Sequence, residues 1–394
     1  MSLASTLAPP SGTPVLSRLA WLDALRGIGA VAVLAEHMLP WVIPSLRPYW
    51  FNLGMYGVLV FFLVSGYIIP TSLERRGDVG GFWIGRIFRL YPLYLTVIAV
   101  VLAASWWIPV RVDVPREPSS VAAHATMLQD VLGTAALVDT MWTLAYEMVF
   151  YLLVTMLFVA RAHRRSGQIA IVFGAAAVVS GLVMAAAPVP PGPWPSWSAF
   201  AVFGVGLACL VSGRFVKPAA WVMGAGALAL LVLTSRVPWF GLAILAVMFA
   251  GTAIQRWERG EGALWPVAVT AALVAVAPAW ATQAGWWWVR PGVWITTIAL
   301  AAATFAVAMA LRRRLSFRFL AWLGTISYSL YLLHHPLLKA FVVVTGDLRR
   351  AALPVQAGMA ALYVVLVLGT SWLTYRCVES PLQRLGRHVI TRRR

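Results

Sequence analysis

Ionisable side chains interrupt the apolar stretches of this 394-residue chain at a few places. His37 lies in the first apolar stretch, Glu147 in a later one and His334 near the end. A charged group inside a bilayer costs about 2.5–3.5 kcal/mol or more on insertion scales, so such groups usually have a function. Histidine titrates near neutral pH and suits general-base work, and a carboxylate can orient it and stabilise its cation. We therefore predict that His37, Glu147 and His334 form a catalytic group.

The heights of these three groups in the membrane support this prediction. At a rise of 1.5 Å per residue, each lies about 20 Å above the inner membrane edge. His335 follows His334, but adjacent residues on a helix diverge by about 100°, so only one of them is expected to face a shared site. A zinc or iron site is the less favoured interpretation, and we predict no metal. Weaker candidates, assigned to substrate binding, are Glu36, Tyr331 and Trp142.

A second polar group consists of arginines. Arg86 and Arg89 are three residues apart in "GRIFRLYP", just before a span expected to open at residue 91, and they share one helical face. Guanidinium groups bind phosphates through paired hydrogen bonds, so the pair is a candidate donor site. From the spacing alone, ordinary anchoring at the cytoplasmic boundary is an equal alternative. Arg26 belongs to the same layer, with Asp23 as a possible ion-pair partner.

Composition indicates the elements that position these groups. Hydrophobic residues make up 61% of the chain and charged residues 11%, and the mean hydropathy is +0.81. The apolar runs are continuous rather than alternating, which argues against an outer-membrane barrel and indicates helices that cross a membrane. The net charge of +18 would suggest nucleic acid in a soluble protein, but here the basic residues lie in short loops between apolar runs. We predict an all-α, polytopic transmembrane helical bundle that binds no nucleic acid.

The apolar runs predict ten to twelve spans, and they leave the number of spans in 197–311 open. The candidates lie near 21–42, 54–72, 91–109, 141–160, 169–187, 197–212, 219–235, 239–255, 263–280, 292–311, 320–343 and 355–376. Most Lys and Arg residues then fall on one side, which predicts that both termini are cytoplasmic. The expected domains are a flexible N-terminal tail over 1–20, a transmembrane domain over 21–382 and a basic cytoplasmic tail over 383–394, with no separate soluble domain.

Five sequence blocks, in order from residue 21 to about 382, resemble the membrane-bound acyltransferase family 3. They are "LDALRGIGAVAVLAEH", "FFLVSGYII", "RIFRLYPLY", "WTLAYEMVFY" and "LGTISYSLYLLHHPLL". The resemblance implies an acyl-CoA donor, usually acetyl-CoA, and a hydroxyl acceptor. It also implies that Arg26 and His37 take part in catalysis, that Arg86 and Arg89 bind the donor, and that Glu147 is functional. His334 stands where the closing block has its usual histidine.

The expected function is therefore an integral-membrane O-acyltransferase of the bacterial cytoplasmic membrane, with no permanently bound cofactor. The acceptor would be a glycan or a macrolide-type natural product, and the family includes a branch that acylates such products. The alternative is a proton-coupled transporter that uses the intramembrane His, Glu and Arg groups as a relay. Transporters often contain inverted repeats, and the sequence contains no evident repeat.

Overall fold

The computed structural model describes residues 17–108, 114–184, 186–312 and 318–393, which form helices and no strands. The long helices are α1 (Ser17–Val42), α2 (Leu53–Arg76), α3 (Val79–Ala104), α5 (Trp142–Val159), α6 (Ser166–Val183), α7 (Pro193–Ser212), α8 (Val216–Leu233), α9 (Pro238–Glu258), α12 (Pro291–Leu311), α14 (Ser327–Thr345) and α15 (Leu353–Thr374). Shorter helices are α4 (Pro118–Ala125), α10 (Trp265–Val276), α11 (Ala279–Gln283), α13 (Arg318–Thr325) and α16 (Ser380–Arg392). The remaining turns are η1 (Pro44–Leu46), η2 (Asp139–Met141), η3 (His163–Arg165), η4 (Trp287–Val289), η5 (Leu348–Arg350) and the π-helical η6 (Tyr375–Glu379).

Within the described residues, ten helical segments are long and apolar enough to cross a membrane. The prediction of an all-α bundle with ten to twelve spans is confirmed. Helices α1 and α14 are not among the ten, although they contain 26 and 19 residues. These two helices carry His37 and His334. Polar side chains such as these lower the mean hydropathy of a helix, which explains why neither helix is among the ten. Two expected spans are broken: 263–280 is α10 followed by α11, and 320–343 is α13 followed by α14.

The third span begins earlier than the sequence suggested. Helix α3 begins at Val79 rather than near 91, and Asp78 caps it by accepting from the backbone N–H of Gly81 at 3.0 Å. No proline lies between this cap and Pro92, and both glycine and proline are tolerated inside membrane helices. Arg86 and Arg89 therefore lie inside the helix and not in front of it.

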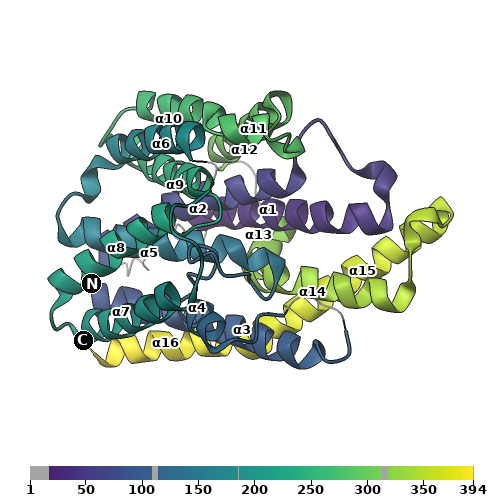
Figure 1. Ribbon diagram of the computed structural model, residues 1–394, viewed down its shortest axis with the longest axis horizontal. Coiled ribbons are helices and arrows are strands. Elements are labelled where there is room, and N and C mark those ends of the chain that lie inside the picture. The colour runs from purple at the N-terminus through teal and green to yellow at the C-terminus, as the bar shows by residue number, and fades with distance from the viewer. Residues whose placement is uncertain (1–16, 109–113, 185, 313–317, 394) are drawn as a thin grey trace, which may run out of the picture.

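The expected basic tail, residues 383–394, is helical over most of its length. Helix α16 continues from α15 through η6 and lies alongside α3 (Figure 1). Gly386 allows this contact, because a Cβ atom there would lie 2.6 Å from Cβ of Phe88. At the other end, α1 begins at Ser17, inside the segment expected to be a tail, and residues 1–16 lie outside the described residues.

Helices α1 and α2 lie between a layer of α6, α9 and α10 and a layer of α3, α7 and α16 (Figure 1). Glycines bring the central helices close together, as small residues do in membrane proteins. A Cβ atom on Gly66 of α2 would lie 1.8 Å from the backbone oxygen of Met248 in α9. A Cβ atom on Gly324 of α13 would lie 1.9 Å from the backbone oxygen of Asp23 in α1. These contacts fix α1 against α13 and α2 against α9.

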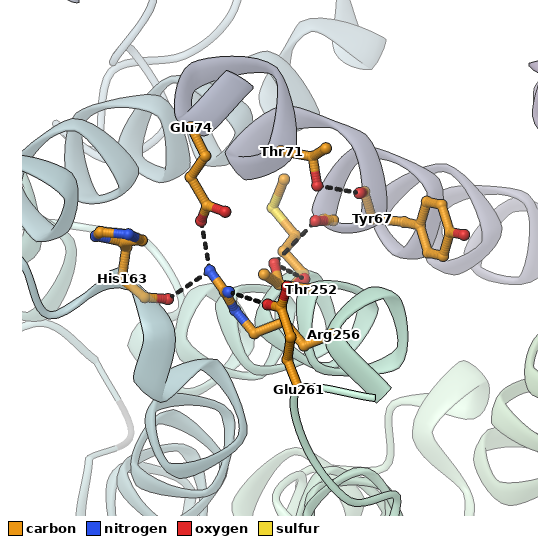
Figure 2. A network of polar contacts seen from close by, with 9 residues as sticks. Tyr67, Thr71, Glu74, His163, Thr252, Arg256 and Glu261 are labelled. Carbon is orange, nitrogen blue, oxygen red and sulfur yellow. Dashed lines mark hydrogen bonds and ion pairs between the residues drawn. The ribbon is translucent and has the colours of Figure 1, made fainter. Parts of the chain in front are cut away.

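A buried ion-pair network joins α2, η3 and α9 (Figure 2). Arg256 is 4% exposed and pairs with Glu74 of α2 and, at 3.0 Å, with Glu261. It also donates to the backbone oxygen of His163 at 3.0 Å. Nearby, Thr252 donates to the backbone oxygen of Gly66 at 2.8 Å. Because two carboxylates neutralise this arginine, we interpret the network as a structural clamp between helices.

Candidate active site

His37 of α1 and His334 of α14 form a hydrogen-bonded pair. Nε2 of His334 lies 3.1 Å from Nδ1 of His37. Nδ1 of His334 donates to the backbone oxygen of Leu330 at 2.9 Å, and Nδ1 of His37 lies 2.9 Å from the backbone oxygen of Val33. A ring nitrogen that meets a carbonyl oxygen must carry the proton. This assigns the proton to Nδ1 in both neutral rings, so Nε2 of His334 accepts from His37 and Nε2 of His37 keeps its lone pair.

His335 also faces His37, and the expectation that only one of the adjacent histidines would do so is wrong. The ring centroids of His334 and His335 lie 5.1 and 5.0 Å from that of His37. The ring centroids of His334 and His335 are 6.4 Å apart, so the ring of His37 is in contact with both side chains. Nε2 of His335 lies 3.7 Å from a carboxylate oxygen of Asp139, whose side chain is 46% exposed. Sequence reasoning missed Asp139, although it stands three residues before the block that carries Glu147.

Glu36 and Trp142, two of the candidates for substrate binding, contact other parts of the protein. Glu36 forms an ion pair with Arg47 at 2.5 Å and accepts from the backbone N–H of Gly54 at 3.4 Å, so it holds the loop that follows α1. Trp142 packs against the rings of Tyr146 and Phe240, with centroids 5.9 and 5.4 Å away.

The arginines and Glu147 lie together around a cavity of about 110 Å³. Its polar lining includes Arg26, Arg86, Arg89, Glu147 and Tyr331. Arg26 forms an ion pair with Asp23 at 2.7 Å, which confirms that pairing. Glu147 accepts a hydrogen bond from the hydroxyl of Tyr151, one turn along α5. The cavity thus brings the predicted donor-binding arginines and Glu147 together, although their heights predicted two separate groups.

Within the described residues, no hydrogen bond or ion pair joins Glu147 to His37. Glu147 shares its cavity with Arg26 instead, which lies eleven residues from His37 on α1. The heights estimated along separate helices therefore did not identify the neighbours of Glu147. The carboxylate found beside the histidines is that of Asp139, which lies near His335.

Tyr331 stands between the cavity and the histidines. It lines the cavity, its hydroxyl lies 2.9 Å from Oγ1 of Thr143, and its ring centroid lies 5.9 Å from that of His334. Arg26 and His37 are eleven residues apart on α1, which is about 16 Å along the helix axis. The site thus has an anion-binding part at one end and an acid–base part at the other.

Comparison with known families distinguishes between the two predicted functions, an acyltransferase and a proton-coupled transporter. Residues 19–376 match the profile of a family described as an acyltransferase domain, Acyl_transf_3. The chain belongs to this acyltransferase family. The match covers nearly the whole chain and confirms the resemblance found in the five sequence blocks. No solved structure matches it.

Bacterial relatives of this acyltransferase are named O-acetyltransferases, and the names of YrhL and of the Listeria OatA refer to peptidoglycan. It is 25% identical over 420 residues to the putative peptidoglycan O-acetyltransferase YrhL of Bacillus subtilis, covering 94% of this chain and 56% of the relative. It is 27% identical over 159 residues to the O-acetyltransferase OatA of Staphylococcus aureus, covering 36% and 25%. It is 28% identical over 149 residues to the peptidoglycan O-acetyltransferase OatA of Listeria monocytogenes, covering 34% and 23%. The chain thus spans about half the length of YrhL and about a quarter of each OatA.

Proposed function

We propose that this protein is an O-acyltransferase of the bacterial cytoplasmic membrane that moves an acetyl group from acetyl-CoA to a hydroxyl group of a glycan. The observation that carries the proposal is the two-part site, in which an arginine-lined cavity and a histidine group meet at Tyr331. Membership of the acyltransferase family supports the transfer chemistry, and the names of the relatives favour a glycan over a macrolide as the acceptor.

Acetyl-CoA suits the arginine end because its phosphates are anionic and its thioester lies at the far end of a long, narrow arm. Arg86 and Arg89 offer planar guanidinium groups for phosphate oxygens. Arg86 already stacks over the rings of Phe82 and Tyr151, with its guanidinium carbon 5.1 and 5.2 Å from their centroids, which holds its donors in a fixed direction. The arm would pass Tyr331 and bring the thioester to the histidines.

His37 is the base in this proposal, because Nε2 is its ring nitrogen with a lone pair to offer. The acceptor oxygen attacks the thioester carbonyl carbon while its proton passes to Nε2 of His37. The carbon–sulfur bond then breaks, and the thiolate of CoA takes the proton back from His37. His334 accepts from Nδ1 of His37 and fixes the orientation of the ring. Direct transfer needs no covalent acyl-enzyme.

The acceptor would approach from the histidine side. Asp139 is 46% exposed there and lies near His335, so the histidine group reaches the protein surface. The loop after α1 adds exposed aromatic rings, with Tyr49 64% and Trp50 62% exposed. If both termini are cytoplasmic, this side faces outward, where a cell-wall glycan is found.

Transfer of a labelled acetyl group tests the proposal. Purified wild-type protein should move label from acetyl-CoA to a peptidoglycan-type oligosaccharide and not to a macrolide. Arg89→Ala and Arg86→Ala should each raise the KM for acetyl-CoA about tenfold, because a hydrogen bond to a charged group is lost. The lysine variants should restore part of the loss, since lysine lacks the planar fork. Absence of acetyl-CoA binding by folded wild-type protein would overturn the proposed donor.

A further inference from the structure

A second cavity, of about 180 Å³, lies between α3 and the C-terminal helix α16. It is lined by Arg76, Phe82, Gly85, Arg86, Phe88, Arg89, Gln383, Gly386, Arg387 and Ile390. Arg86 and Arg89 therefore line both cavities, one on each side of α3. Arg76 and Arg387 are exposed, whereas Arg86 and Arg89 are half-buried. The positively charged side chains are therefore found both at the surface and further inside the protein.

The four arginines of this cavity form no direct ion pair with a carboxylate among the described residues, although Glu147 shares the inner cavity with Arg86 and Arg89. Within the described residues, no ion pair reaches Arg76, Arg86, Arg89 or Arg387. Other half-buried and buried arginines do have partners: Arg26 with Asp23, Arg47 with Glu36 and Arg256 with Glu74. Like charges gathered at a partly desolvated site repel one another unless an anion joins them. The arrangement therefore favours the binding of a multiply charged anion.

Helix α16 completes this cavity, and it lies beyond the part of the chain that matches the acyltransferase family. The family match ends at residue 376, and α16 begins at Ser380. Its position is set by backbone packing, because Gly386 lies against Phe88 with no room for a side chain. This contact places Gln383 and Arg387, one helical turn apart on either side of Gly386, over Arg86 and Arg89.

We propose that the cavity between α3 and α16 binds the phosphate groups of the acyl donor, and that Gln383 and Arg387 of α16 close this phosphate site. This inference rests on the proposed function, because it takes the donor to be an acyl-CoA. The phosphates would lie in the cavity of four arginines, and the acyl arm would extend past Arg86 and Arg89 into the inner cavity. Anionic lipid headgroups share this phosphate chemistry and are the other possible source of the ligand.

The test compares Arg387→Glu with Arg384→Glu. Both variants make the same charge change on exposed positions of α16, but only Arg387 lines the cavity. The probe is adenosine 3′,5′-diphosphate, which carries CoA-type phosphates without the arm. Its affinity is measured on full-length protein in nanodiscs of phosphatidylcholine, with and without phosphatidylglycerol. Arg387→Glu should weaken binding about tenfold or more in both lipids, and Arg384→Glu should change it far less.

A second readout separates this inference from the proposed function. The preference for acetyl-CoA over S-acetylpantetheine, as a ratio of kcat/KM, should fall in Arg387→Glu because only acetyl-CoA carries the adenosine phosphates. Equal affinities for the probe in Arg387→Glu and wild type would overturn the phosphate site while leaving acetyl-CoA as the donor. An effect of Arg387→Glu confined to nanodiscs with phosphatidylglycerol would assign the cavity to lipid headgroups and overturn the donor assignment. Wild-type protein that binds neither acetyl-CoA nor the probe would instead overturn the proposed function.

Discussion

The two nitrogens of the His37 ring have different surroundings, and this difference determines which of them can act as a base. Nδ1 lies close to both the backbone oxygen of Val33 and Nε2 of His334. A neutral imidazole has one proton, and two acceptors at Nδ1 hold it there. Nε2 is then free to receive a proton from a substrate. His334 has the opposite position: its Nδ1 donates to Leu330 and its Nε2 is occupied by His37.

His37→Ala should therefore lower kcat by about 10²–10⁴, the usual loss when a positioned base is removed, with little change in acetyl-CoA affinity. His334→Ala should lower kcat less, because it removes the group that orients the base and leaves the base itself. Single-turnover rates on detergent-purified variants, with folding checked by thermal melting, measure both. Near-normal transfer by His37→Ala would contradict the assignment and make His334 the first candidate for the base.

Between elements, the segment that joins α4 to α5 is packed into the bundle and does not form an exposed loop. Met127, Leu128, Val131 and Leu132 are each 3% exposed or less. Within this segment, Asp130 accepts from the hydroxyl of Tyr146 at 2.8 Å. Burial raises the pKa of the Asp130 carboxyl above its usual value, although the hydrogen bond from Tyr146 and the charge of Arg236 act to lower it. The segment that supports the start of α5 thus contains a carboxylate that is costly to ionise.

This shift predicts a dependence of stability on pH. An acid with a raised pKa holds its proton more tightly in the folded state, so the free energy of unfolding falls as pH rises from the unfolded pKa through the folded pKa. Asp130→Asn keeps an acceptor for Tyr146 and cannot ionise. It should melt a few degrees above wild type at pH 7, and the difference should shrink as the pH is lowered through the folded pKa. A variant that melts below wild type at pH 7 would mean that Tyr146 and Arg236 outweigh the cost of burial.

At the scale of the whole molecule, orientation in the membrane connects the site to its substrates. From the positions of the two ends along α1, we expect the arginine end and the basic loops on one side of the membrane and the histidine end on the other. The excess of Lys and Arg on the first side predicts that it is cytoplasmic. A donor from the cytoplasm and an acceptor from outside would then meet at the histidines without either molecule crossing the protein.

Labelling with a membrane-impermeant maleimide tests this orientation. In a variant whose Cys209 and Cys377 are replaced by alanine, Arg164→Cys in η3 should be labelled only after the cells are opened. Tyr49→Cys in the loop after α1 should be labelled in intact cells, since this position is 64% exposed. The loop at 312–318 is expected on the cytoplasmic side too, but 313–317 lie outside the described residues. Labelling of Arg164→Cys in intact cells would reverse the orientation and the proposed donor side.

The sequence by itself determined the membrane-spanning helices, the acyltransferase family and the residue types that gather at the site. Continuous apolar runs leave few alternatives to membrane helices, and spacing along a helix gives each polar group its height. Spacing does not determine which helices are neighbours, because that depends on how side chains and glycines pack between them. Tertiary structure therefore decided that Glu147 lies with the arginines, and that His37 meets both His334 and His335. Packing also decided that α16 lies against α3, since the sequence pattern of a short basic segment does not reveal the partner that covers its apolar face.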